Sequence, residues 1–269
     1  MTVSKITQTE LIRVAHALAD AARPVTLAYF RATGLAAENK ADAGFDPVTI
    51  ADRGAEEAMR AVLAKSRPDD AILGEEHGFQ AGTSGLTWVL DPIDGTRGYI
   101  SGTPTWGVLI SVRDDSGPLF GVIDQPYIGE RFAGGFGVAE AHGPQGKVIL
   151  QCRAPRPLAQ ATVLTTFPEV GTPEEGAAFH AVARHAQLTR YGMDCYAYAL
   201  LAAGQVDLVI EAGLNAYDIQ APIAVIEAAG GIVTDWSGAP AHEGGRVIAA
   251  ANAAIHAEAL AILGQSLRG

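Results

Sequence analysis

The stretch Trp88-Val89-Leu90-Asp91-Pro92-Ile93-Asp94-Gly95-Thr96 joins a short apolar run to two carboxylates three residues apart. An apolar run of this length that ends abruptly in polar residues is typical of a buried strand leading into a functional loop. Asp91 and Asp94 offer the hard oxygen ligands that Mg²⁺ prefers. Pro92 fixes the backbone between them, so the Ile93 carbonyl can become a further ligand. The pattern predicts a strand that feeds a metal site.

Gly95 and Thr96, at the end of this stretch, open a helix or a tight turn. Their backbone N–H groups can face an anion, as helix N-termini and turns do for phosphate. Metal and phosphate binding would then share one loop. Asp-Pro and Asp-Gly are also ordinary turn formers, so the stretch by itself leaves a plain turn open.

The overall composition is that of a globular protein with an acidic balance. The chain has 269 residues, 48% hydrophobic and 18% charged, with a formal net charge of −11. This charge argues against general binding to nucleic acids or to anionic membranes, because both need a basic face. An acidic protein also repels phosphate esters, and bound cations are the simplest way to reverse the local field.

The two cysteines, Cys152 and Cys195, are far apart and belong to no Cys-x-x-Cys pair, which predicts a reduced, cytoplasmic protein. The N-terminus leads into no signal-like apolar stretch, and no window reaches the ~20 apolar residues that cross a bilayer. The seven histidines are scattered without the spacing of a zinc site. We therefore expect neither a membrane nor a nucleic-acid partner.

At the N-terminal end, apolar residues at helical spacing predict a helix over residues 9–22. Thr7 or Thr9 is expected to cap it, and Pro24 to end or kink it. Residues 33–45 carry glycines and charged side chains and read as a polar, mobile loop.

Two further acidic segments precede the central stretch. Asp46-Pro47-Val48-Thr49-Ile50-Ala51-Asp52 leads into a helix and places Asp52 where an N-cap is expected. A short strand over residues 71–73 runs into Glu75 and Glu76. If its end lies beside that of the central strand, three or four carboxylates meet, and such crowding is costly unless cations neutralise it.

Beyond the central loop the pattern changes near residue 150. Strands over residues 105–112, 119–124 and 131–134, separated by turn residues, predict an antiparallel meander. Strands and helices then alternate, which indicates a layered α/β half. The expected strands are 162–165, 206–211, 232–234 and 247–251, and the expected helices are 174–186, 194–203, 218–229 and 255–267. We predict two closely packed subdomains, residues 1–150 and 151–269.

Asn215-Ala216-Tyr217-Asp218 places another aspartate at the start of an apolar helix that ends in Glu227-Ala228-Ala229-Gly230-Gly231. As an N-cap residue Asp218 would be ordinary. If the helix points into the same cleft, Asp218 supplies a fifth carboxylate.

These acidic segments, taken in order, closely resemble the inositol monophosphatase family of metal-dependent phosphatases, and the resemblance spans nearly the whole chain. Within that family the chain is most similar to the bacterial histidinol-phosphate phosphatases. The segments that carry this closer similarity are Ile123-Asp124-Gln125-Pro126, Gly129-Glu130-Arg131-Phe132, Arg190-Tyr191-Gly192-Met193-Asp194-Cys195-Tyr196 and Asp207-Leu208-Val209-Ile210-Glu211-Ala212-Gly213-Leu214.

The resemblance implies a layered αβαβα sandwich of the α/β (α+β) class, a homodimer, and two or three Mg²⁺ ions in each active site. Glu75, Asp91 and the Ile93 carbonyl would hold the first ion. Asp91, Asp94 and Asp218 would hold the second, and a third would bind near Glu75. Two such metals clamp a phosphate ester, one activating water and the other stabilising the leaving alkoxide.

The resemblance also implies catalytic roles for Thr96, Asp52 and Glu75, with Thr96 bonded to Asp52 to orient the attacking water. Hydrolysis would be in line, without a phosphoenzyme. The residues that the resemblance places at the substrate are Ile93, Asp94, Gly95, Thr96, Arg190, Asp194, Glu211 and Asp218.

The expected reaction is hydrolysis of L-histidinol phosphate in histidine biosynthesis. Its amine and imidazole can donate hydrogen bonds to Asp194 and Glu211, and Arg190 can hold substrate or phosphate. Alternatively, Asp194 caps the following helix and Arg190 forms a structural ion pair. Met193 and Asn215-Ala216 depart from the family pattern, where a glycine and Lys-Pro are expected. Both departures border the expected substrate end of the cleft.

Two other functions stay open. The same chemistry can act on inositol 1-phosphate or a broad set of sugar phosphates, with Glu211 accepting sugar hydroxyls. Alternatively, the fold serves as a regulatory or RNA-associated binding protein whose phosphatase activity is incidental. The acidic net charge and the complete ligand set count against this last function.

Overall fold

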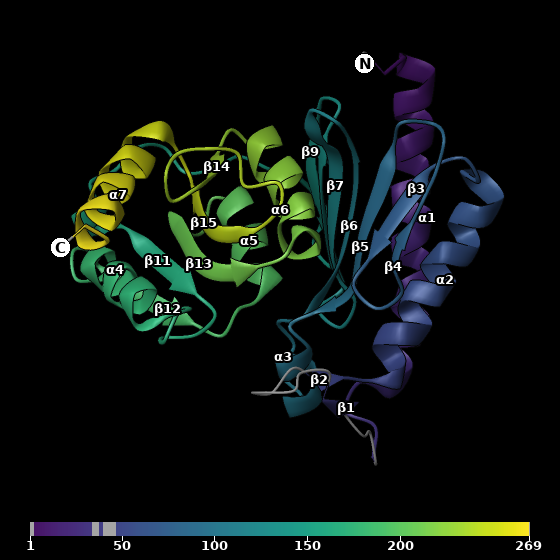
Figure 1. Ribbon diagram of the computed structural model, residues 1–269, viewed down its shortest axis with the longest axis horizontal. Helices are drawn as coiled ribbons and strands as arrows, with labels where there is room; N and C mark the ends of the chain where they lie inside the picture. The colour runs from purple at the N-terminus through teal and green to yellow at the C-terminus, as the bar shows by residue number, and fades with distance from the viewer. Residues whose placement is uncertain (1–2, 34–37, 40–46, 269) are drawn as a thin grey trace.

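The computed structural model describes residues 3–33, 38–39 and 47–268, and within them five layers follow one another as αβαβα (Figure 1). Helices α1 (Lys5–Tyr29) and α2 (Ile50–Ser66) cover the outer face of the larger sheet. Helices α5 (Cys195–Ala202) and α6 (Ala216–Ala228) lie between the two sheets. Helices α4 (Pro173–Ala183) and α7 (Ala253–Ser266) cover the outer face of the smaller sheet. The predicted layered fold is confirmed.

The larger sheet has eight strands among the described residues, in the order β10-β9-β8-β7-β6-β5-β3-β4. Their bounds are β3 Ala71–Gly74, β4 Gly78–Gln80, β5 Thr87–Asp94, β6 Gly107–Asp114, β7 Gly117–Gln125, β8 Glu130–Gly135, β9 Val138–Gly143 and β10 Gly146–Ile149. Only β3 and β5 pair in parallel. The predicted meander is confirmed in β6, β7 and β8, and it continues into β9 and β10, which the sequence pattern missed.

The smaller sheet has the order β12-β11-β13-β15-β14 in the described part of the chain. Its strands are β11 Thr162–Thr165, β12 Leu188–Tyr191, β13 Leu208–Leu214, β14 Ile232–Asp235 and β15 Gly245–Ala250. The predicted alternation of strands and helices is confirmed, except that β12 was not predicted. This edge strand exposes three of its four side chains and therefore lacks the apolar pattern of a buried strand. The division near residue 150 stays a prediction.

Four short elements complete the described chain. Strand β1 (Glu38–Asn39) pairs with β2 (Pro47–Val48), α3 (Thr96–Ser101) follows β5, and a single 3₁₀ turn spans Leu158–Gln160. Apart from residues 33, 38 and 39, the predicted polar loop over residues 33–45 lies outside the described residues. No helix in the described ranges is long and apolar enough to cross a membrane.

Helix α1 is longer than predicted at both ends. Its N-cap is Ser4, whose hydroxyl accepts from the Thr7 N–H, so neither Thr7 nor Thr9 is the cap. The expectation that Pro24 ends the helix is wrong, because the helix continues to Tyr29. A proline inside a helix costs about 3 kcal/mol. Here the buried face of α1, packed on α2 and the larger sheet, continues past the proline to Thr26 and offsets that cost.

Candidate active site

The parallel pairing of β3 and β5 brings two acidic strand ends together. Gly74 lies opposite Leu90, and the Glu75 N–H donates to the Leu90 carbonyl over 3.1 Å. Glu75 and Asp91 therefore leave adjacent strands at the same edge, and their side chains are in hydrogen-bonding contact. Asp91 is only 1% exposed, and one of its oxygens accepts from the Ile93 N–H over 3.0 Å.

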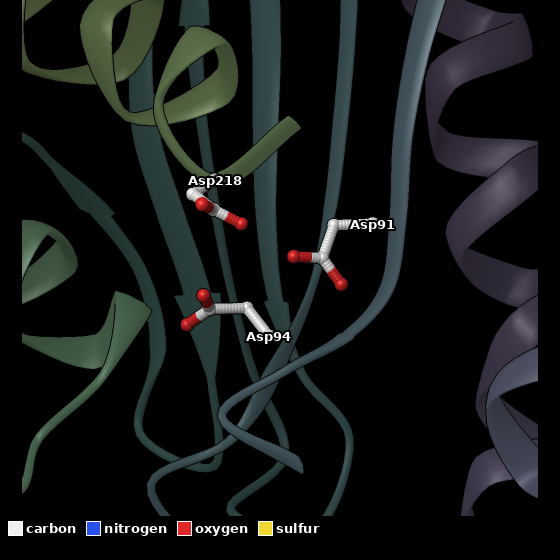
Figure 2. Close-up of side chains that lie close together, drawn as sticks. All are labelled: Asp91, Asp94 and Asp218. Carbon is white, nitrogen blue, oxygen red and sulfur yellow. The ribbon is translucent and has the colours of Figure 1, made fainter. Parts of the chain in front are cut away.

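The start of α6 adds a half-buried carboxylate, Asp218, from a distant part of the chain. Figure 2 shows Asp91, Asp94 and Asp218 turned toward one another, and their ligand oxygens all lie within 4.8 Å. Oxygen donors gathered in this way suit Mg²⁺, which binds through carboxylates. The structure thus brings together three of the predicted metal ligands, with Glu75 beside Asp91.

Asp218 is held by the helix that carries it. Its Oδ2 accepts from the Asn215 N–H over 2.6 Å, in a capping box in which Asn215 is the N-cap. The expectation that Asp218 is the N-cap is therefore wrong. Asn215 keeps an extended backbone, so the helix starts at Ala216 and Asp218 falls in its first turn. This anchor fixes the orientation of the carboxylate toward the cluster.

Asp52 is held in the same manner at the start of α2. Thr49 is the N-cap, and its N–H and hydroxyl donate to Asp52 Oδ2 over 2.8 and 2.5 Å. Asp52 is thus not the N-cap that the sequence suggested. Its other oxygen accepts from the Thr96 hydroxyl over 3.2 Å, and the same hydroxyl lies 3.1 Å from the Ile93 carbonyl. Thr96 and Asp52 are in contact, while their catalytic roles stay predictions.

The turn between β5 and α3 requires glycine at position 95. Gly95 has a φ of 85°, in the left-handed region that side chains rarely adopt. A Cβ added there would lie 2.7 Å from Asp194 Cγ. The backbone of the predicted phosphate loop therefore lies directly against the carboxylate of Asp194.

The gathered carboxylates raise one another's pKa values. Burial, followed by the negative charges of Glu75, Asp94 and Asp218, holds the pKa of Asp91 well above its usual range. Burial, followed by the charges of Asp194 and Asp218, also raises the pKa of Asp94, although the Cys195 N–H donates to it over 2.5 Å. Divalent cations would relieve this repulsion, so the residues present fit a metal.

The acid cluster lines a cavity of about 390 Å³. Glu211 lines the same cavity; it is 7% exposed and accepts from the Thr166 N–H and hydroxyl over 2.9 and 2.8 Å. Burial, which outweighs these two hydrogen bonds, raises the pKa of Glu211 to about 7. The charges of Asp194 and Asp218 act in the same direction as burial.

Asp194 and Arg190 were also predicted to bind substrate, but only Asp194 lines the cavity. Asp194 begins α5, but its side chain does not cap that helix; it accepts from the Thr105 hydroxyl over 3.3 Å and lines the cavity. Burial raises its pKa against the opposing effects of Thr105 and the positive charge of Arg97. Arg190 is exposed on β12, outside the residues that line the cavity. Its role in binding substrate stays a prediction, and no ion pair of Arg190 is found among the described residues.

Four residues that line the cavity lie in no segment that the sequence analysis singled out: Arg97, Thr166, Phe167 and Tyr198. The Arg97 guanidinium carbon lies 5.0 Å from the centre of the Phe167 ring, which is 43% exposed. Thr166 and Phe167 follow directly on strand β11, so a search of every strand end would have found them. Tyr198 lies inside the apolar helix α5, where nothing in the sequence distinguishes it from a core residue.

Glu211 gives a pH dependence of stability that can be measured without metal. Because its folded pKa is about 7 and its ordinary value is 4.5, the folded state binds the proton more tightly, and stability falls as pH rises between these values. In chelator, wild type is expected to lose roughly 3 kcal/mol relative to Glu211→Gln between pH 4.5 and 8. Urea unfolding at both pH values measures this difference, and a difference that does not change with pH would contradict the assignment.

The chain was compared with known protein families and sequences. The model of the inositol monophosphatase family matches residues 7–268. The bifunctional phosphatase IMPL2 of Arabidopsis thaliana, described as chloroplastic, is 44% identical over 87% of this chain and 68% of its own length. A histidinol-phosphatase of Streptomyces coelicolor is 35% identical over 94% of this chain and 97% of its own.

The fold also matches solved structures over nearly its whole length. An inositol monophosphatase from Zymomonas mobilis superposes with a TM-score of 0.84 at 38% identity, covering 97% of this chain and all of that one.

Proposed function

The chain belongs to the inositol monophosphatase family, whose members are metal-dependent phosphomonoesterases, and we propose that it hydrolyses L-histidinol phosphate to L-histidinol and phosphate in histidine biosynthesis. The gathered carboxylates of Asp91, Asp94 and Asp218 support the metal-dependent chemistry. The similarity to histidinol-phosphatases and the buried acid Glu211 support the substrate.

In this proposal the residues that hold two or three Mg²⁺ ions are Glu75, Asp91, Asp94, Asp218 and the Ile93 carbonyl. Bound Mg²⁺ supplies charge neutralisation on the phosphate and lowers the pKa of bound water. The protein's own groups would position the phosphate ester and the attacking water, and such positioning supplies most of the rate in phosphoryl transfer.

Thr96 and Asp52 would orient the attacking water. Because Thr96 donates its one hydroxyl proton to Asp52 or to the Ile93 carbonyl, its lone pairs are left to accept from the water. The Gly95 and Thr96 N–H groups would bind phosphate oxygens at the start of α3.

The single observation that carries the choice of substrate is the state of Glu211. It is a buried carboxylate whose ionisation is disfavoured by its surroundings, and no cationic side chain in the described chain forms an ion pair with it. A buried charge of this kind is costly unless it is paired. An alcohol that carries an ammonium or imidazolium group would provide the missing charge, and histidinol carries both an amine and an imidazole.

A polyol phosphate such as inositol 1-phosphate is the second candidate. A carboxylate accepts hydrogen bonds from hydroxyl groups as well as from cations, and the similarity to an inositol monophosphatase favours it. The two candidates differ in one property, because only histidinol phosphate delivers a positive charge to Glu211.

Substrate preference is expected to depend on the charge of Glu211. With Mg²⁺ present, wild type should show a kcat/KM at least tenfold higher for histidinol phosphate than for inositol 1-phosphate. Glu211→Gln keeps an acceptor for Thr166 but removes the charge, so it should lower kcat/KM for histidinol phosphate by about 10- to 100-fold, the range for losing a hydrogen bond to a charged group.

The matched control is Glu169→Gln, an exposed glutamate outside the cavity lining, which should leave both values unchanged. A wild type that prefers inositol 1-phosphate would reject histidinol phosphate as the substrate. An equal fall in kcat/KM of Glu211→Gln on both substrates would show that Glu211 does not distinguish them by their charge.

We also propose a homodimer in the cytoplasm, as the family resemblance and the cysteine usage suggest. The Arabidopsis relative is described as chloroplastic, so location varies among similar proteins.

A further inference from the structure

Tyr198 has a buried hydroxyl group that lacks a hydrogen-bond partner among the described residues. Its side chain is 3% exposed on α5, and it belongs to the cavity lining. The other buried polar atoms without a partner in the described chain belong to residues outside that lining. Buried hydroxyls are normally bonded, so an unbonded one on a residue that lines a cavity points to a partner that binds in that cavity.

The surroundings of this hydroxyl are acidic. After burial, the charges of Glu211, Asp94 and Asp218 raise the pKa of Tyr198 well above its usual range. The phenol therefore stays protonated and can both donate and accept a hydrogen bond. Its neighbours include two members of the acid cluster and Glu211, the acid proposed to bind the leaving group.

We propose that Tyr198 is a specificity-determining residue whose hydroxyl group hydrogen-bonds a nitrogen on the leaving group of the substrate. This inference rests on the proposed function and deepens it. A nitrogen-bearing alcohol bound to Glu211 would lie close to Tyr198, because the charge of Glu211 acts on the Tyr198 hydroxyl. A leaving group that is a plain alkyl chain leaves the hydroxyl unbonded, so it gains nothing from Tyr198.

The test compares Tyr198→Phe with wild type on two phosphate esters in Mg²⁺. Histidinol phosphate has nitrogens in its leaving group, whereas propyl phosphate has none. Tyr198→Phe keeps the ring that packs in the core and removes only the hydroxyl. The matched control is Tyr196→Phe on the same helix, because the Tyr196 hydroxyl donates to Glu130 over 2.7 Å and lies outside the cavity lining.

Tyr198→Phe is expected to lower kcat/KM for histidinol phosphate about five- to tenfold, as for the loss of one neutral hydrogen bond, and to change the value for propyl phosphate less than twofold. Tyr196→Phe should leave the ratio of the two values unchanged. Thermal unfolding of each variant shows that it is folded.

The outcomes separate this inference from the proposed function. A parallel fall on both esters would place the hydroxyl at the phosphate or metal end and overturn the inference. No change on either ester would overturn it too, because an ordinary water would then satisfy the hydroxyl. If wild type turns over neither ester, the proposed function fails and this inference fails with it.

Discussion

Asp94→Asn is expected to lower kcat by at least about a thousandfold, because it removes a charge from the predicted metal site. The side chain is suited to this test. Its Oδ2 accepts from the Cys195 N–H over 2.5 Å, and an asparagine oxygen can accept the same bond. The substitution therefore keeps size and anchoring while it removes the charge that binds cations. Steady-state kinetics with saturating Mg²⁺ measures the loss.

Without metal, the same variant should be more stable than wild type. Because Asp94 lies against Asp91, Asp194 and Asp218, removing its charge relieves repulsion and should raise Tm in chelator. Adding Mg²⁺ should raise the Tm of wild type and have little effect on that of Asp94→Asn.

Asp115→Asn, an exposed change far from the cavity lining, is the control and should match wild type in both measurements. Activity of Asp94→Asn within tenfold of wild type would contradict the metal site. A biological role that survives in the inactive variant would instead favour the regulatory or RNA-associated binding function.

Thr96→Val is expected to lower kcat by about 100- to 1000-fold while KM changes less than threefold, because general acid–base positioning acts on the transition state. Valine keeps the β-branched shape at the start of α3 but cannot bond Asp52 or accept from water. Thr96→Ser restores the hydroxyl and should recover activity to within about tenfold of wild type, since a serine hydroxyl has the same donor and acceptor capacity.

The matched control is Thr103→Val, whose hydroxyl donates to the Gly98 carbonyl just after α3 and lies outside the cavity lining. It should keep wild-type kcat and KM. A rise in KM at constant kcat for Thr96→Val would mean that Thr96 binds substrate without orienting water.

Glu75, Asp91 and Asp94 could be predicted as site residues from local pattern, because each comes at the end of a short apolar run. The run from Trp88 to Leu90 marks a buried strand by its composition, and Glu75 follows a second short apolar run. The structure places these ends side by side through parallel pairing. The positions of the helix caps were wrong because aspartate itself caps helices well. The N-caps are Thr49 and Asn215, each three residues before its aspartate. Asp52 and Asp218 accept from the backbone N–H groups of these caps in capping boxes.

The remaining lining residues of the cavity could not be predicted in the same way, because they meet only through tertiary packing. Tyr198 reads as one more apolar residue of α5, and Arg97 and Phe167 come from opposite halves of the chain. Edge strand β12 was missed for the opposite reason, since its exposed side chains carry no periodic pattern. Segments that are distant in sequence therefore decide whether the cavity residues and strand β12 are buried or exposed, and single-sequence patterns do not record this.

The capping boxes of α2 and α6 also explain how so acidic a molecule can receive a phosphate. Asp52 and Asp218 both lie in the first turn of their helices. Asp52 accepts from Thr96 and Asp218 lies beside Asp94, and both Thr96 and Asp94 line the cavity. The partial positive ends of two macrodipoles therefore lie near the same cavity, each equivalent to roughly half an elementary charge. This backbone charge does not titrate, so it attracts an anionic ester at every pH at which the helices persist.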